Sequence, residues 1–160
     1  LMLEKLALYT PGFGLSVLFS SQEEIGEQGA RVAAFGCAPT HAIAVDVSFG
    51  RVPGDREEQT GKMYGGPMIG FAPVLNKKMG QALCSLAQRL SIPYQREIMG
   101  RTTGTNADQI AVSGTGVKTV TVSIPLKNMH TPVEVVSLQD IEATAQLLAA
   151  FVQSGEVLSI

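Results

Sequence analysis

The sequence predicts an α/β fold, in which helices cover both faces of a mainly parallel, mixed sheet in a three-layer α/β/α sandwich. Short runs rich in β-branched residues alternate along the chain with amphipathic helical segments, the pattern of a doubly covered sheet. The 160 residues suffice for one domain, spanning 1–160, whose core needs no disulfide or metal. No apolar run approaches the roughly 18 residues of a membrane-spanning helix.

The first half of the chain supplies two strands and two helices. Helix-forming residues at helical spacing predict a helix at Leu1–Leu8, and an apolar, β-rich run predicts a strand at Leu15–Ser20. A helical pattern follows Gly26 and stops at Gly36. The apolar run His41–Val47 predicts a second, buried strand, which carries an acid near its carboxyl end.

A loop, a strand, a helix and another strand are expected in the middle of the chain. Glycine, proline and charge interrupt the segment Phe49–Gly66, which predicts a loop that is solvated, or that lines a pocket or an oligomer contact. A short strand is predicted at Pro67–Phe71. An apolar stripe makes Asn76–Leu90 the best amphipathic helix. Ile92–Met99 is a strand candidate, with Pro93 at its start or on an edge.

The last third of the chain predicts a central strand and a closing helix. The polar glycine loop Gly100–Asp108 opens a short helix, and Val, Thr and Ile residues predict a strand at Val117–Ile124. A loop bracketed by prolines follows at Pro125–Pro132. The helix Leu138–Val152 closes the chain, with Ser137 as its N-cap.

Composition excludes several classes of function. The 12 Lys and Arg residues against 14 Asp and Glu residues give a net charge of −2 without basic runs, so we expect neither nucleic acid nor an acidic membrane surface as a partner. Only two cysteines occur, Cys37 and Cys84, and we interpret both as reduced core thiols of a cytoplasmic protein. The charged fraction of 16% is low beside roughly 25% in typical domains, which suggests a surface that further protein covers.

Metal-capable side chains follow three of the predicted strands. Glu23 and Glu24 follow the first, Asp46 ends the second and His130 follows the last. Because the carboxyl ends of parallel strands meet at one sheet edge, we expect a shared site there. Each residue alone also fits a structural role, such as a helix-terminal charge or a capping residue. His41 opens a strand without polar neighbours and is expected to be an ordinary surface histidine.

Five segments, in this order, resemble the glutamyl-aminopeptidase and tetrahedral aminopeptidase family, which is metallopeptidase family forty-two. These segments are Ser21–Ala30, Ala42–Val47, Gly104–Asp108, Val122–Pro125 and Met129–Glu134. The resemblance covers essentially the whole chain. It implies the zinc-dependent exopeptidase fold, similar to phosphorylase/hydrolase proteins, and the C-terminal part of a metalloaminopeptidase catalytic domain.

The resemblance also implies roles for the acidic residues and the histidine. Glu23 would be the general base, Glu24 and His130 ligands of one metal, and Asp46 a ligand of the other. Two divalent ions, zinc or cobalt, would then activate water for attack on the N-terminal peptide bond of peptide substrates. Family members assemble into homo-oligomers from dimers to hollow dodecamers, and we expect a dimer or a higher oligomer here.

Two departures from the family pattern limit these expectations. The upstream His-x-Asp motif and the metal-bridging Asp of the family are missing, and the opening helix lacks an N-cap. We therefore expect a fragment, truncated at its N-terminus, that binds metal weakly or not at all and is inactive alone.

Asn106 stands where the family usually carries Asp, which leaves its role open. Asp108 is expected to be an exposed acid in the first turn of a helix, with a displaced form of the family's Asp role as the alternative.

Two other functions stay open. A glycoside hydrolase, the older label of some family members, could use the Glu23 and Glu24 carboxyls, but it gives Asp46 and His130 no task, and the chain has no Trp to stack against sugars. A non-catalytic scaffold or binding module would keep the fold without the reaction.

Overall fold

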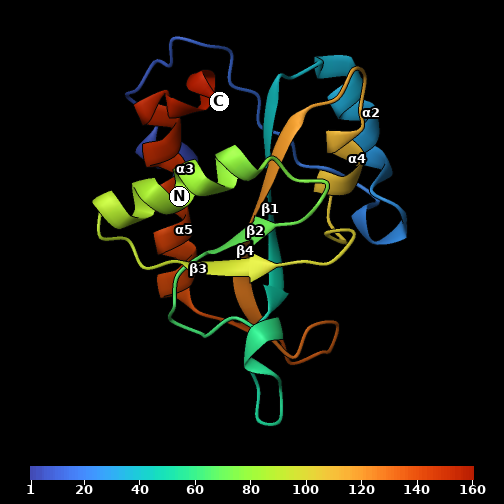
Figure 1. Cartoon of the computed structure of the whole chain (residues 1–160), viewed down its shortest axis with the longest axis vertical. Coiled ribbons are helices and arrows are strands. Elements are labelled where there is room, and N and C mark those ends of the chain that lie inside the picture. The colour runs from blue at the N-terminus through green and yellow to red at the C-terminus, as the bar shows by residue number, and fades with distance from the viewer.

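The computed structural model describes all residues from 1 to 160, which form five α-helices and five strands (Figure 1). The helices are α1 (Met2–Lys5), α2 (Gln28–Cys37), α3 (Lys77–Arg89), α4 (Ala107–Ala111) and α5 (Leu138–Ser154). The strands are β1 (His41–Phe49), β2 (Met68–Phe71), β3 (Gln95–Ile98), β4 (Lys118–Lys127) and β5 (Val135–Val136). Three 3₁₀ turns are also present, at Glu23–Ile25, Glu57–Gln59 and Glu156–Ser159.

The strands form one mixed sheet in the order β1-β4-β2-β3, with β5 paired to β4. β1 runs parallel to β4, and β2 runs parallel to β3. β4 pairs antiparallel with both β2 and β5, over only two residue pairs each. Most residue pairs are therefore parallel, which confirms the predicted α/β class and its mostly parallel, mixed sheet.

Helices pack against both faces of the sheet (Figure 1). On one face α3 and α5 enclose the main core, a cluster of eleven buried residues that includes Val120 and Val122 of β4 and Phe151 of α5. On the other face α2 and α4 pack together through Ala30, Ala34 and Ile110. Because side chains alternate along a strand, β4 turns its valines to the first face and its buried Thr and Ser residues to the second.

The predicted strand at Leu15–Ser20 is wrong. This segment has no regular secondary structure and no backbone hydrogen bonds, and Phe19 is 88% exposed. An apolar run becomes a strand only where a neighbouring strand pairs with its backbone and buries its side chains, and no strand of this chain lies in that position. The opening helix is also shorter than predicted, since α1 ends at Lys5.

Two other boundaries differ from the predicted ones. β3 begins at Gln95, after Pro93, because proline has no N–H to donate to the ladder. β4 continues through Pro125 to Lys127, three residues beyond the predicted end. The other predicted helices and strands lie where the periodicity places them, within a few residues, and Ser137 caps α5 as predicted. The two-residue strand β5 forms in a segment whose sequence predicts no strand. Cys84 is buried as predicted, whereas Cys37, at the end of α2, is exposed.

A buried aspartate links α5 to the loop that enters β2. Asp140 is 1% exposed, and its carboxylate accepts hydrogen bonds from the backbone N–H groups of Tyr64 and Gly66, both at 2.8 Å. A carboxylate at the start of a helix also interacts favourably with the helix dipole. Asp140 therefore fixes the end of the long 49–66 loop.

Replacing this aspartate should destabilise the fold. In the Asp140→Ala variant two backbone N–H groups lose their acceptor, and we expect a loss of about 1–3 kcal/mol in the free energy of unfolding, measured by urea denaturation. Gln139→Ala, at the exposed neighbouring position, is the control and should change stability by less than about 0.5 kcal/mol. Equal effects of the two substitutions would contradict this role.

Candidate active site

The four residues proposed from the sequence lie together at the edge where β1 and β4 end. Asp46 lies near the end of β1, and the loop after β4 brings His130 to the same edge. Glu23 and Glu24 form the 3₁₀ turn before α2. The imidazole Nε2 of His130 lies 3.4 Å from Oε1 of Glu24. The glutamate pair thus lies at this edge even though the strand expected before it does not form.

Unusual backbone conformations hold the glutamate pair. Gln22 and Glu27, on either side of the turn, have φ values of 58°, in the left-handed region that non-glycine residues seldom adopt. The turn closes on α2 because Gly29 lacks a side chain: a Cβ there would lie 2.5 Å from the backbone oxygen of Ser21. Strain of this kind often gathers at functional sites, where the surrounding structure holds side chains in set positions.

The loop that carries His130, residues 128–134, also contains left-handed backbone conformations. Asn128 and His130 have φ values of 58° and 61°. The backbone N–H of His130 donates to the Glu134 carboxylate at 2.6 Å, and the Thr131 hydroxyl donates to the Asn128 carbonyl at 2.6 Å. These bonds leave the His130 side chain, which is 69% exposed, free to face Glu24.

Negative charge accumulates at this edge. Burial, together with the nearby charges of Asp46 and Glu24, raises the pKa of Glu23, and His130 partly offsets this. Burial also raises the pKa of Asp46, with a further contribution from the charge of Glu24, while a hydrogen bond from the Val47 N–H at 2.8 Å opposes it. Mutual repulsion between carboxylates is the property that a bound cation would relieve.

A third strand adds a carboxylate that sequence reasoning missed. Glu97 of β3 accepts hydrogen bonds from the hydroxyl of Ser48 in β1 and from that of Ser123 in β4, the latter at 3.0 Å. Burial raises the pKa of Glu97, and so does the charge of Asp46, while the two serines act in the opposite direction. The only signal for Glu97 in the sequence is that an acidic residue stands within the predicted strand Ile92–Met99.

The glycine loop before α4 is organised by Asp108. Its carboxylate accepts hydrogen bonds from the N–H groups of Thr103 and Gly104 and from the Thr103 hydroxyl, at 2.9–3.0 Å. Asp108 lies in the first turn of α4, as predicted, but it is half-buried rather than exposed, because the loop folds back over it. The Asn106 side chain donates to the Ser20 hydroxyl at 2.9 Å and so links this loop to the segment Leu15–Ser20.

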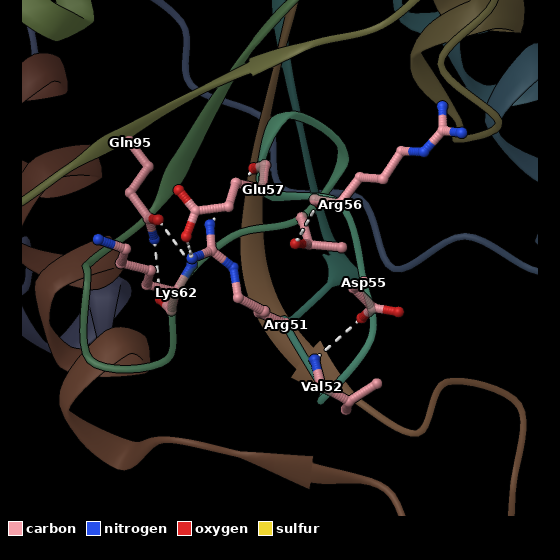
Figure 2. A network of polar contacts seen from close by, with 8 residues as sticks. Arg51, Val52, Asp55, Arg56, Glu57, Lys62 and Gln95 are labelled. Carbon is pink, nitrogen blue, oxygen red and sulfur yellow. Dashed lines mark hydrogen bonds and ion pairs between the residues drawn. The ribbon is translucent and has the colours of Figure 1, made fainter.

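The 49–66 loop is exposed to solvent over residues 53–59, and polar contacts order it. Figure 2 shows Arg51 paired with Glu57 across the loop. It also shows the Gln95 side chain of β3, which accepts from the Lys62 N–H at 2.7 Å and donates to the Lys62 carbonyl at 2.9 Å. The loop leaves β1 just after Asp46 and is therefore held in place beside the candidate site.

The donor types at this edge suit a divalent metal, but the set is incomplete. Carboxylate and imidazole groups are ligands of zinc and cobalt, and Glu24 and His130 already lie side by side. No three His, Cys, Asp or Glu side chains of the chain converge closely enough to hold one ion. His41 cannot complete the set, because it lies at the opposite end of β1, beside Thr40.

The raised carboxyl pKa values predict a stability change when Asp46 is replaced. The pKa of Asp46 is higher in the folded chain than in the unfolded chain. Between these two pKa values the folded state binds more protons than the unfolded state, so the stability of the fold falls as the pH rises through this interval. Asn cannot ionise, and it can still accept the Val47 hydrogen bond. Asp46→Asn should therefore be more stable than the unsubstituted chain at neutral pH and equal to it near about pH 3. Urea unfolding at both pH values measures this, and a less stable variant at neutral pH would contradict it.

Fold and site together define a class of protein. A mostly parallel sheet that gathers carboxylates and an imidazole at the carboxyl ends of its strands is an arrangement suited to metal-dependent hydrolysis. The family model of the M42 glutamyl aminopeptidases matches residues 2–147, and the chain belongs to this family.

Individual relatives agree with this assignment. The chain is 36% identical over 137 residues to the lysyl aminopeptidase of Pyrococcus furiosus, a match over 86% of this chain and 40% of that protein. An aminopeptidase structure from Desulfurococcus kamchatkensis superposes with a TM-score of 0.86 at 33% identity, over 94% of this chain and 44% of the other. The Pyrococcus horikoshii TET1 peptidase, which assembles into a tetrahedron or a large octahedral shell, matches with a TM-score of 0.67 at 29% identity, over 84% and 39% of the chains.

This chain thus spans about 40% of the length of the curated relative. None of its helices has both the length and the apolar character needed to cross a bilayer.

Proposed function

We propose that the chain supplies part of the active site of a metal-dependent aminopeptidase, which removes N-terminal residues from peptides. The observation that carries the proposal is the contact between Glu24 and His130, next to Glu23 and at the same sheet edge as Asp46, in a chain of the M42 family. In this arrangement Glu24 and His130 would hold one divalent ion and Asp46 would hold a second. When bound, zinc or cobalt supplies Lewis acidity toward the peptide carbonyl and lowers the pKa of water.

Glu23 suits the role of general base. It lies beside the proposed ligand Glu24 in the same turn, and neighbouring residues of a tight turn direct their side chains differently. The pKa of Glu23 is raised toward neutral pH, which favours both the uptake and the release of a proton by its carboxyl group. Glu23 would take a proton from the attacking water and return it to the amine that leaves when the peptide bond breaks.

We also propose that the active protein is a homo-oligomer. The TET1 relative assembles into a tetrahedron or a large octahedral shell, and several large apolar side chains of this chain are exposed on α2 and on the segment Leu15–Ser20. These exposed residues include Leu18, Phe19, Val32 and Phe35. Contact with further protein would bury them.

A chimera tests the proposed reaction. The chain replaces the segment that it matches in the Pyrococcus furiosus lysyl aminopeptidase, and hydrolysis of lysyl-p-nitroanilide is measured with cobalt, with zinc and after chelation. We expect turnover that requires added metal. A folded, oligomeric chimera that binds metal and hydrolyses nothing would contradict the proposal.

One observation favours a non-catalytic role for the 160-residue chain by itself: no three metal-capable side chains converge in it. We therefore expect the isolated chain, with excess cobalt or zinc, to hydrolyse aminoacyl-p-nitroanilides no faster than a blank without protein. Turnover that is strong and abolished by Glu23→Gln would show that the chain needs no further ligands.

A further inference from the structure

The Glu97 carboxylate reaches across the sheet to the strand that carries Asp46. Glu97 lies in β3, and β2 and β4 separate β3 from β1 in the sheet. Even so, the carboxylate accepts hydrogen bonds from the hydroxyls of Ser48 in β1 and Ser123 in β4. Glu97 of the outermost strand β3 thus bonds to β4 and β1, the two strands that lie beyond its neighbour β2.

Glycine in β2 permits this crossing. Gly70 is the residue that pairs with Glu97 in the register of β2 and β3. A Cβ at Gly70 would lie 1.8 Å from the hydroxyl of Thr121 in β4 and 2.5 Å from the Met99 methyl group. Gly70 therefore places no side chain beside Glu97 on this face of β2, which leaves room for the Glu97 carboxylate to reach β4.

Both serines are placed to hold Asp46. Ser123 is the register partner of Asp46, and Ser48 follows Asp46 by two residues, so it projects from the same face of β1. β1 is an edge strand whose only strand partner is β4. The one hydrogen bond of the Asp46 side chain goes to the N–H of the next residue, Val47, so its position depends on the backbone at the end of β1.

We propose that Glu97 is a positioning residue of the candidate site: through Ser48 and Ser123 it holds the end of β1 on β4 and thereby fixes Asp46 relative to Glu24 and His130. The inference rests on the proposed function, because Asp46 is a ligand only there. Glu97 itself is not a ligand in this account, since both of its carboxylate oxygens are engaged by serine hydroxyls. Outer-shell groups of this kind commonly change metal affinity about 10- to 100-fold when they are removed.

The first test measures the position of β1 without metal. Amide hydrogen exchange is followed in the 160-residue chain and in its Glu97→Ala, Glu97→Gln and Ser48→Ala variants. We expect Glu97→Ala to speed exchange at the end of β1, including Gly50, whose N–H bonds to the Leu126 carbonyl, by about 10-fold or more, with little change in the α3–α5 core. Gln can accept from one serine and donate to the other, so it should restore most of the protection. Exchange at the end of β1 that is unchanged in Glu97→Ala would overturn the proposal.

The second test uses cobalt(II) chloride as the probe. The affinity and the visible absorption spectrum of the bound ion are measured for the same variants. Glu142→Ala, which removes an exposed carboxylate paired with Lys5, is the matched control. We expect a loss of affinity of about 10-fold in Glu97→Ala and a smaller loss in Ser48→Ala. The Gln variant and the control should stay close to the unsubstituted chain.

The outcomes separate the two proposals. Cobalt binding that Glu24→Gln weakens but Glu97→Ala does not would overturn the role of Glu97 and leave the proposed function intact. Cobalt that binds nowhere near Glu24 in the unsubstituted chain would count against the proposed function, and the exchange rates then decide whether Glu97 holds β1. If Glu97→Ala does not fold, Ser48→Ala and Ser123→Ala each remove one of the two bonds and carry both measurements.

Discussion

Glu23→Gln, introduced into the lysyl aminopeptidase chimera, should lower turnover by about 10²- to 10⁴-fold, the range attributed to a general base. The amide keeps the shape of the side chain but cannot take a proton from water at neutral pH. The loss should fall on kcat, because the group acts on the reacting water and not on the bound peptide. Steady-state hydrolysis of lysyl-p-nitroanilide measures it.

Two controls separate the base from the ligands. Glu27→Gln makes the same chemical change four residues later, at the residue before α2, and should leave turnover within a few fold of the unsubstituted chimera. Glu24→Gln removes a proposed ligand, so it should lower the bound metal content as well as turnover. Glu23→Gln, in contrast, should retain its metal. A Glu23→Gln chimera that turns over normally, or that loses metal in parallel with activity, would be incompatible with a general base at this position.

Gly66→Ala is the substitution from which we expect the largest loss of stability. Gly66 has a φ of +78°, and a Cβ at this position would lie 1.9 Å from the Pro93 carbonyl oxygen. That neighbour is backbone and cannot rotate away. In addition, the Gly66 N–H donates a hydrogen bond to the Asp140 carboxylate, and a shift of Gly66 would disturb this bond. Left-handed strain and overpacking together should cost about 2–5 kcal/mol in the free energy of unfolding.

Gly54 provides the matched control for Gly66. It too has a positive φ, +97°, but no atom lies within 4 Å of its Cβ position. Gly54→Ala should therefore show the backbone strain alone, about 1–2 kcal/mol. Urea denaturation of both variants isolates the effect of the Pro93 clash as the difference between them. Equal losses would mean that the backbone at Pro93 moves aside without cost.

The parts of the fold that could be predicted are those specified by local pattern. The buried strand around Asp46, the long central strand and the closing helix carry their periodicity and caps within a few residues of sequence. The run Leu15–Ser20 has the same local pattern, but it has no strand beside it to pair with, and pairing is a property of the tertiary structure.

The residues of the candidate site likewise fall into those that the sequence could predict and those that it could not. Glu23, Glu24, Asp46 and His130 could be proposed because each follows or ends a predicted secondary-structure element within a segment that resembles the family. Glu97 could not, because its partners Ser48 and Ser123 lie 49 and 26 residues away, and only the strand order brings them together. The burial of Asp108 could not be predicted for a related reason: the loop before α4 folds back onto its carboxylate.

A cobalt titration of the ¹⁵N-labelled 160-residue chain, followed by NMR, tests most directly whether Glu24, Asp46 and His130 belong to one metal centre, in which Glu24 and His130 hold one ion and Asp46 a second. Paramagnetic broadening reports proximity to the ion even when binding is weak, and His41, at the far end of β1, serves as an internal control for adventitious binding to an imidazole. We predict that the amide signals of Glu24, Val47 and His130 broaden together at low cobalt, before that of His41, and that Asp46→Asn weakens the effect. Broadening that begins at His41, or that reaches His130 without Val47 and Glu24, would contradict a shared site.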